Sequence, residues 1–295
     1  MSIPVSVRGL QLRYGDAVAL DGLTFDLAGG KIYGLLGRNG SGKTSLLSVL
    51  AAFRRATGGT VLVDGEDPFE NARITRQVCL IRDNVDAEDT DRVGGVLGLA
   101  ARLRPNWDAD YASRLVKQFD LPLRKRVSGL SRGGRSALGV TLGLATRAPL
   151  TIFDESYLGL DAPSRYTFYQ ELVADYAENP RTIILSTHLI EEVANLFEEV
   201  LIIDRGRLLV HEETETLRQR GATVTGEAGA VDAFVTGNGL EALGEKRLGG
   251  TKATTTYGLL TDGQRRAAAA SGLDISPVGL QDLFIHLTAA AGSPR

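Results

Sequence analysis

Eight residues near the N-terminus, Gly37-Arg38-Asn39-Gly40-Ser41-Gly42-Lys43-Thr44, match the complete phosphate-binding pattern G-x-x-x-x-G-K-[ST]. An apolar run over 32–36 precedes the motif and a helical pattern over 45–53 follows it, so the motif lies between a strand and a helix. Backbone N–H groups can surround a phosphate chain only where no side chain blocks their approach, and the start of the helix directs its positive dipole end at the same anion. The sequence therefore predicts a nucleotide-binding protein.

The residues of this loop have separate predicted roles. We expect Lys43 to reach the β- and γ-phosphates of the nucleotide and to take part in catalysis, and Thr44 to hold Mg2+. The other residues expected to contact the nucleotide are Gly37, Asn39, Gly40, Ser41, Gly42 and Ser45.

Composition limits the class of protein that can carry this loop. With 295 residues, of which 43% are hydrophobic, the chain can form one large or two modest globular domains. Lys and Arg number 33 against 36 Asp and Glu, so we expect no nucleic-acid partner. The one cysteine, Cys79, cannot form an intramolecular disulfide, which is consistent with the cytosol. The most apolar long window, 137–153, is interrupted by Arg147 and Pro149 and is too short to span a bilayer, so we expect membrane contact only through another chain.

The first half of the chain predicts three structural layers. Strands with period-two alternation at 5–12 and 18–27, and a third strand at 60–63, predict an antiparallel β layer beside the phosphate-loop strand. Helical periodicity over about 84–135 predicts an inserted helical lobe. From residue 136 onward helices alternate with apolar strands, which is typical of an α/β fold with a parallel sheet covered on both faces.

A shift in composition near residue 216 predicts two domains, 1–215 and 216–295. We expect the second domain to be a small α+β domain. Its candidate strands lie at 223–225, 252–257 and Ile275, and its helical patterns at 229–236, 262–271 and 279–289. No residue of this domain has catalytic or metal-ligand spacing, so no chemistry is assigned to it.

A second motif places carboxylates at the end of a strand. The apolar run 150–153 is followed directly by Asp154 and Glu155. The carboxyl end of a parallel strand faces the crevice into which the phosphate loop also opens. We expect Asp154 to hold Mg2+ and Glu155 to orient or deprotonate an attacking water molecule. Taken alone, the two acids could also simply end a strand at the surface.

Five motifs, taken in order, resemble those of the ATPase subunit of an ABC transporter. They are the phosphate loop, Leu130-Ser131-Arg132-Gly133-Gly134, Phe153-Asp154-Glu155, Gly159-Leu160-Asp161 and Ser186-Thr187-His188. In that family the second is the signature motif, the fourth is the D-loop and the histidine is the switch residue. The resemblance covers residues 3 to about 215. The runs 104–108, 157–161 and 186–190 are similar to the YtrB-like branch of bacterial transporter ATPases.

The resemblance implies a P-loop NTPase fold of ABC type that hydrolyses ATP with Mg2+. It implies a dimer, homomeric or heteromeric, in which ATP on the loop of one subunit meets Ser131 and Gly133 of the other. Tyr14 would stack on adenine, Asp161 would contact the nucleotide, and His188 would bind the γ-phosphate and help hold the water near the catalytic glutamate. A separate transmembrane permease would be driven, in export, by this cytoplasmic subunit on the inner face of the cell membrane.

Several positions depart from the family's pattern, among them Ser156 and Tyr157, which replace the Pro-Thr that commonly follows the catalytic glutamate. Asp83, or Asn84, stands where a glutamine commonly contacts Mg2+. Because an acid adds negative charge beside Asp154, we expect Asp83 to reach the metal through water. The signature motif has Arg132 where glycine is usual and Gly134 where glutamine is usual.

Two other functions stay open at this point. The first is a soluble ABC ATPase that acts on the ribosome, DNA or a protein assembly. Ribosomal members resemble two fused ATPase domains and DNA-repair members carry long coiled-coil insertions, whereas this sequence shows one ATPase domain and no such insertion. The second is a regulatory ATP-binding module with little turnover, which the acid at position 83 keeps open.

Overall fold

The computed structural model describes residues 2–83 and 90–290. By its contacts the chain divides into two compact units, Met1–His188 with Ile203–Leu208, and Leu189–Ile202 with Leu209–Arg295. These units interleave along the sequence, whereas we predicted one boundary between residues 215 and 216. The six-stranded sheet described below contains residues of both units. The boundary between residues 215 and 216 therefore stays a prediction.

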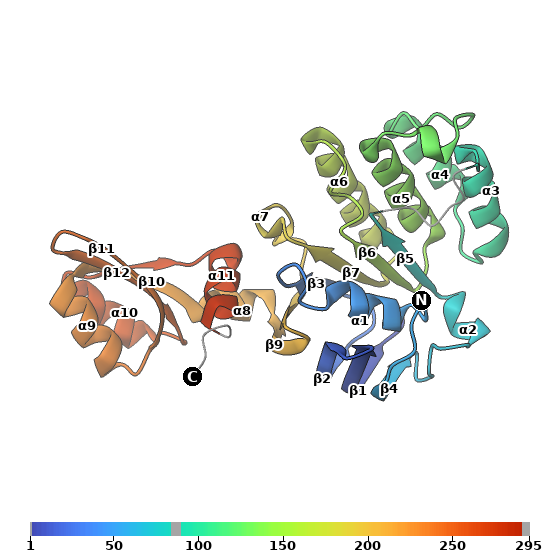
Figure 1. The fold of residues 1–295 in the computed structure, drawn as a ribbon. Helices are drawn as coiled ribbons and strands as arrows, with labels where there is room; N and C mark the ends of the chain where they lie inside the picture. Colours follow the sequence, from blue (N-terminus) through green and yellow to red (C-terminus); the bar gives the residue numbers. More distant parts are fainter. Residues whose placement is uncertain (1, 84–89, 291–295) are drawn as a thin grey trace. The chain divides into compact units, whose positions relative to one another are not determined.

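The N-terminal layer is a three-stranded antiparallel sheet with the order β2-β1-β4 (Figure 1). Its strands are β1 (Val5–Tyr14), β2 (Ala17–Leu27) and β4 (Gly58–Val63). Buried and exposed residues alternate over most of β2, because one face of the sheet packs on the core. The predicted antiparallel layer is confirmed.

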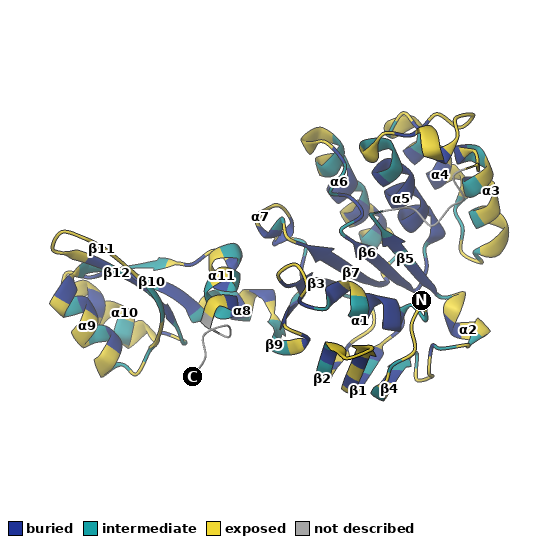
Figure 2. Ribbon diagram, viewed as in Figure 1, coloured by how far each residue is buried: buried dark blue, intermediate teal, exposed yellow. Residues whose placement is uncertain are grey.

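The central layer is a six-stranded sheet with the order β5-β6-β7-β3-β8-β9. Its strands are β3 (Ile32–Leu36), β5 (Val78–Arg82), β6 (Leu150–Asp154), β7 (Thr182–Thr187), β8 (Glu199–Asp204) and β9 (Arg207–Glu213). The pairs β5–β6, β6–β7 and β7–β3 are parallel. Every residue of β3, β6 and β7 is buried (Figure 2), as expected for strands covered on both faces.

Register brings the ends of three of these strands to one edge of the sheet. Leu36 at the end of β3 lies opposite Thr187 of β7, and Asp154 at the end of β6 lies opposite Ser186. The residues that follow these strands are therefore neighbours in space, although they are far apart in sequence. This edge carries the candidate site.

Helices cover the sheet and form the predicted lobe. Helix α1 (Lys43–Leu50) contacts strands of both sheets. Of the lobe predicted over 84–135, residues 84–89 lie outside the described part. The remaining helices of the first unit are α2 (Ala72–Thr75), α3 (Val93–Leu103), α4 (Ala109–Gln118), the short 3-10 helix at Val127–Gly129, α5 (Arg132–Thr146) and α6 (Ala162–Glu178).

The C-terminal region contains a βαββαβ arrangement, so its α+β class is confirmed. Its antiparallel sheet has the order β11-β12-β10-β13. Apolar side chains of α9 and β10, among them Val231 and Val224, pack into one core. The elements of this region are α7 (Ile190–Val193), α8 (Thr214–Arg220), β10 (Gly221–Glu227), α9 (Ala228–Gly237), β11 (Glu241–Leu248), β12 (Thr251–Tyr257), α10 (Asp262–Ala270), β13 (Asp274–Pro277) and α11 (Leu280–Ala290). Within residues 2–83 and 90–290, no helix combines the length and hydrophobicity that crossing a bilayer requires.

Candidate active site

The phosphate loop joins β3 to α1 and needs its glycines. Gly42 has a φ of 106°, and a Cβ placed there would lie 2.7 Å from the carbonyl oxygen of Ala19. A Cβ at Gly37 would lie 2.6 Å from the carbonyl oxygen of Ile203. Neither approach is possible for a residue with a side chain, so the glycines let the loop pack tightly against neighbouring strands.

A cavity of about 290 Å³ opens on this loop. Most of the predicted loop residues line it, and the catalytic candidate Glu155 lines it as well. Ala19 of β2 also contributes, which no sequence motif indicated. The lining residues are Ala19, Asn39, Gly40, Ser41, Gly42, Lys43, Thr44, Ser45 and Glu155.

Lys43 is the first residue of α1, and its buried side chain reaches back to the start of the loop. Its Nζ donates to the carbonyl oxygens of Gly37 at 2.7 Å and Arg38 at 3.3 Å, and lies 3.6 Å from Glu155 Oε1. Only 6% of the side chain is exposed. Its charge is therefore held where it would meet the phosphate chain of a nucleotide.

Glu155 lies between Lys43 and His188. One carboxylate oxygen is 3.6 Å from Lys43 Nζ and the other is 3.6 Å from His188 Nδ1. The residue has a φ of 53°, which is uncommon for a side-chain-bearing residue, and its N–H donates to the carbonyl oxygen of Ser186 at 3.2 Å. Such strained backbone is often found at functional sites, and here it directs the carboxylate toward the loop.

Asp154 is buried beside Glu155. Burial raises the pKa of Asp154; the hydroxyls of Thr44 and Ser186 oppose the rise, the charge of Glu155 adds to it and that of Lys43 opposes it. Its Oδ1 is buried and has no hydrogen-bond partner among the described residues. A buried carboxylate oxygen without a partner, next to a threonine hydroxyl, fits a Mg2+ ligand set.

Protein side chains alone would not complete that ligand set. In the described ranges, no group of three or more His, Cys, Asp or Glu side chains could hold a metal ion. Mg2+ commonly keeps several water ligands and binds substrate phosphates with only one or two carboxylates. The site therefore suits a metal that arrives together with a nucleotide.

Asp83 follows β5 at the same edge of the sheet. The preceding residue, Arg82, lies opposite Asp154 in the β5–β6 register. Asp83 Oδ2 is 3.4 Å from Arg132 Nη2, while Asp83 Oδ1 is buried without a partner in the described part of the chain. The alternative candidate, Asn84, lies outside the described residues.

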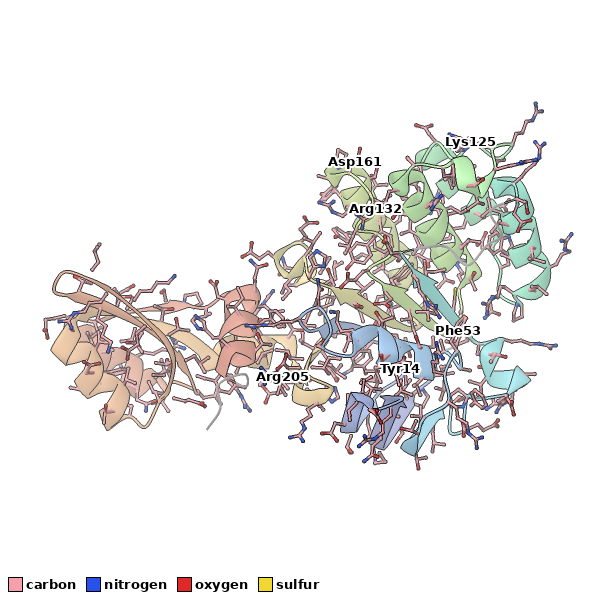
Figure 3. The ribbon with its side chains drawn as sticks, in the orientation of Figure 1. Tyr14, Phe53, Lys125, Arg132, Asp161 and Arg205 are labelled. Carbon is pink, nitrogen blue, oxygen red and sulfur yellow. The ribbon has the colours of Figure 1, made fainter. Side chains whose placement is uncertain are left out.

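Five predicted nucleotide contacts do not line the loop cavity: Tyr14, Gly37, Ser131, Gly133 and Asp161. Ser131 caps α5 by accepting a hydrogen bond from the N–H of Gly134 at 3.1 Å. A Cβ placed at Gly133 would lie 3.2 Å from the carbonyl oxygen of Gly159, on the loop that leads from β6 to α6. Asp161 caps α6 by accepting from the N–H of Ser164 at 3.0 Å (Figure 3). Ser131, Gly133 and Asp161 therefore lie at two helix starts outside the phosphate-loop cavity.

Tyr14 ends β1 near the phosphate loop. Its hydroxyl is 3.4 Å from Ser45 Oγ, and the Arg54 guanidinium carbon lies 5.5 Å from the centre of its ring. Tyr14, which is labelled in Figure 3, does not line the loop cavity, and the residue is 44% exposed. It is therefore at the rim of the site.

Comparison with known proteins identifies the family. The ABC transporter family model matches residues 20–157. Over 254 residues the chain is 34% identical to the Nod factor export ATP-binding protein I of Ralstonia nicotianae, an alignment that covers 82% of this chain and 75% of that protein. The chain belongs to the ABC transporter family. This ABC ATPase therefore binds ATP and hydrolyses it, and it is an ATP-binding subunit of an ABC transporter.

Two further similarities agree with the sequence-based expectations. The ABC transporter ATP-binding protein YtrB of Bacillus subtilis is 26% identical over 215 residues, which covers 73% of this chain and 74% of that protein. A solved ATP-binding subunit of an ABC transporter superposes with a TM-score of 0.66 at 23% identity, over 72% of this chain and 91% of the other. The predicted P-loop fold of ABC type is thus confirmed.

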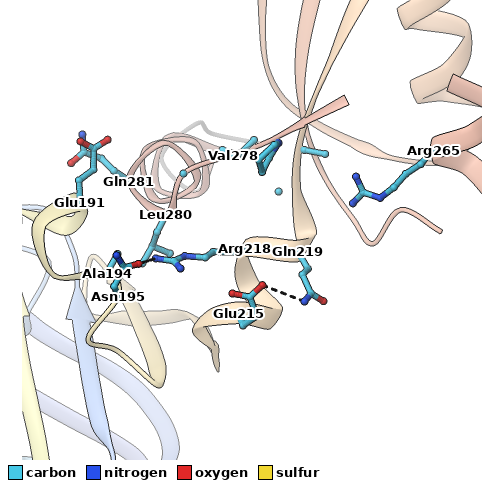
Figure 4. Close-up of a pocket in the computed structure, with 14 residues that line it drawn as sticks. Glu191, Ala194, Asn195, Glu215, Arg218, Gln219, Arg265, Val278, Leu280 and Gln281 are labelled. Atoms are coloured by element: carbon cyan, nitrogen blue, oxygen red, sulfur yellow. Dashed lines mark hydrogen bonds between the residues drawn. The ribbon is translucent and has the colours of Figure 1, made fainter. Parts of the chain in front are cut away.

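A second, larger cavity of about 640 Å³ lies among α7, α8, α10 and α11 (Figure 4). Arg218 Nη2 donates to Asn195 Oδ1 at 2.9 Å on its wall, and Gln219 Nε2 donates to Glu215 Oε1 at 3.4 Å. None of the predicted site residues lines it. No motif in the sequence indicated this cavity.

Proposed function

We propose that this ABC ATPase drives export through a separate transmembrane permease, which it contacts from the cytoplasmic face of the membrane. The observation that carries the proposal is that Lys43 and His188 both lie 3.6 Å from Glu155, which lines the phosphate-loop cavity of this family member. The relative from Ralstonia nicotianae is named for Nod factor export, which supports the export direction.

The residues of the site have distinct proposed roles. Lys43 binds the β- and γ-phosphates, Thr44 and Asp154 hold Mg2+, and Asp83 reaches the metal through water. When bound, Mg2+ neutralises phosphate oxygens and so favours the transfer of the phosphoryl group to water. Glu155 is the base that takes a proton from that water.

The remaining site residues have proposed roles in binding. His188 contacts the γ-phosphate and helps to hold the water near Glu155, from which its Nδ1 is 3.6 Å away. Tyr14 stacks on adenine at the rim of the site, where its ring is partly exposed. The backbone N–H groups of the glycine loop surround the phosphates.

We propose that a second ATPase subunit completes the site. Ser131 and Gly133 lie at the start of α5 and Asp161 at the start of α6, and none of them lines the subunit's own cavity. A helix start favours an anion because its N–H groups and dipole are positive there. The ATP bound on one loop would therefore meet Ser131, Gly133 and Asp161 of the other subunit.

Light scattering of the purified chain tests the composite site. With Mg–ATP, the Glu155→Gln variant should double its molar mass, because bound nucleotide is retained. Adding Ser131→Ala should reduce the doubling, whereas Ser128→Ala, three residues earlier, should not. If the chain binds ATP but its molar mass does not change, a homodimer is contradicted. If the mass also does not change after mixing with a second, different ATPase subunit, the composite site is contradicted.

An apolar groove on the first unit supports the proposal that this ATPase binds a protein partner. The groove has a volume of about 220 Å³ and lies between the end of β5 and helix α3. Phe53 beside it is 53% exposed and Leu103 is 63% exposed, which is unusual for large apolar side chains that gather in one place. The guanidinium carbon of Arg82 lies 4.4 Å from the centre of the Phe53 ring (Figure 3 labels Phe53). We assign this groove to a cytoplasmic helix of the permease.

Affinity purification from the native host in mild detergent tests the partner. A membrane-embedded protein should be recovered in a fixed ratio, and Leu103→Glu should lower its yield. Leu248→Glu, at an 86% exposed residue of the C-terminal region, is the matched control and should not. Recovery without a membrane protein would favour a soluble, non-transport ATPase. ATP binding without phosphate release would favour a regulatory module.

A further inference from the structure

Two residues whose types depart from the family's motifs, Arg132 and Asp83, contact each other through their side chains. Arg132 lies in the signature motif and Asp83 follows β5, and they are 49 positions apart in sequence. Arg132 Nη2 nevertheless lies 3.4 Å from Asp83 Oδ2. A glycine at position 132 would have no side chain to make this contact, and a glutamine at position 83 would have no charge to pair with it. The two departures are therefore complementary.

Asp83 belongs to the edge of the sheet that carries the catalytic carboxylates. Because Arg82 lies opposite Asp154 in the parallel β5–β6 register, Asp83 follows at the same end as Glu155. One of its carboxylate oxygens is buried without a partner in the described ranges, and the other pairs with Arg132. Asp83 thus links this edge to the helical lobe.

Arg132 lies beside a second segment at that edge. It is the first residue of α5, directly after the capping residue Ser131. A Cβ placed at Gly159 would lie 3.0 Å from Arg132 Cγ and 3.1 Å from the Arg132 carbonyl oxygen. Gly159 lies on the loop that leads from Glu155 to α6. The side chain of Arg132, labelled in Figure 3, therefore pairs with the segment that follows β5 and lies beside the one that follows β6.

We propose that Arg132 and Asp83 form a latch within one subunit, which holds the turn at residues 131–134 in a fixed position relative to Asp154 and Glu155. The inference rests on the proposed composite site, in which this turn serves the nucleotide of the second subunit. The latch couples two parts of the subunit. One is the strand edge that carries Asp154 and Glu155 of its own site, and the other is the turn at 131–134, which completes the site of the second subunit. In this role Arg132 positions the signature turn and does not itself contact the reacting atoms.

The strength of the latch follows from its exposure. The side chains of Arg132 and Asp83 are 69% and 46% exposed, so solvent screens their attraction. Pairs of this kind change equilibria about two- to fivefold. The latch therefore biases the position of the turn and leaves it able to move.

Amide hydrogen exchange over residues 131–135, measured on the full chain without ATP, tests the latch. Asp83→Asn and Arg132→Gln should each speed exchange about two- to fivefold, since either change removes the same interaction. The double variant should exchange no faster than the faster single variant. Arg132→Lys keeps the charge and should retain part of the protection.

A second ion pair, between α4 and α6, supplies a matched control. Arg114 Nη2 lies 3.1 Å from Glu171 Oε2, and the Arg114 side chain is 64% exposed. Both residues lie within their helices, whereas Arg132 begins α5. Arg114→Gln should leave exchange at 131–135 unchanged. Effects that multiply in the double variant, no effect in either single variant, or an equal effect of Arg114→Gln would each overturn the latch.

Turnover gives an independent readout of the same pair. Arg132→Gln should lower kcat for ATP hydrolysis about two- to fivefold and leave the Kd for ATP unchanged, because Arg132 does not line the loop cavity. A lower ATP affinity with unchanged kcat would contradict a positioning role. Exchange is measured without nucleotide, so failure of the proposed function and failure of the latch give different results.

Discussion

The Gly42→Ala substitution tests whether the loop geometry is what allows nucleotide binding. Gly42 has a φ of 106°, so an alanine there would occupy a backbone region that costs about 1–3 kcal/mol. Its Cβ would also lie 2.7 Å from the Ala19 carbonyl oxygen, which belongs to a strand and cannot swing away. Forcing an extra carbon into a packed place costs about 1–3 kcal/mol more. An empty variant loop can relax, but it must regain this geometry to bind ATP. The combined cost of at least about 2 kcal/mol therefore predicts a Kd for ATP about 30-fold higher or more.

Gly40→Ala separates the two contributions. Gly40 lies in the same loop with a φ of 78°, but a Cβ there would meet nothing within 4 Å. It should show the backbone cost alone, about 1–2 kcal/mol, and so bind ATP more tightly than Gly42→Ala by about fivefold or more. Gly95→Ala in α3, where a Cβ also meets open space, should leave ATP affinity unchanged.

Equilibrium titration with a fluorescent ATP analogue measures all three variants. Thermal unfolding, recorded alongside, shows whether each protein is folded at the temperature of the titration. Equal affinities of Gly40→Ala and Gly42→Ala would refute the argument from the Ala19 contact. Unchanged affinity in both would refute the assignment of this loop as the phosphate site.

Two further predictions concern stability. Asp161→Ala should lower the free energy of unfolding by about 1 kcal/mol because Ser164 N–H loses its cap, whereas Asp161→Asn should retain the cap; urea denaturation measures both, and equal losses would contradict capping. Because burial raises the pKa of Asp154, the stability that its carboxyl contributes is fully present below the ordinary pKa of 3.8 and is lost as the pH rises through the folded-state pKa. In Mg2+-free buffer, wild type should therefore lose stability relative to Asp154→Asn as the pH rises above about 4; a difference in unfolding free energy that does not vary with pH would count against this.

The convergence of the site was predictable because its parts follow strands of one parallel sheet. Lys43, Glu155 and His188 each come directly after or near the carboxyl end of a buried strand, and a parallel sheet collects such ends at one edge. Local patterns were therefore sufficient to place these three side chains together. The loop glycines were equally predictable, since the motif spans consecutive residues.

Other features depend on contacts that no local pattern encodes. The Asp83–Arg132 pair joins side chains 49 positions apart, and the close approach of Gly42 to Ala19 depends on how the phosphate loop packs against β2. Strand β11 was not among the predicted strands. It is an edge strand of which most residues are exposed, so it lacks the alternation of apolar residues by which strands are recognised.

The direct test of the account is γ-phosphate release in a single turnover by Glu155→Gln. If Glu155 is the base, release should be about 10²- to 10⁴-fold slower than in wild type, while the Kd for ATP is unchanged. Glu178→Gln, the same substitution at an exposed residue that ends α6, should release phosphate at the wild-type rate. Release by Glu155→Gln at the wild-type rate would contradict hydrolysis by Glu155 at the Lys43 loop.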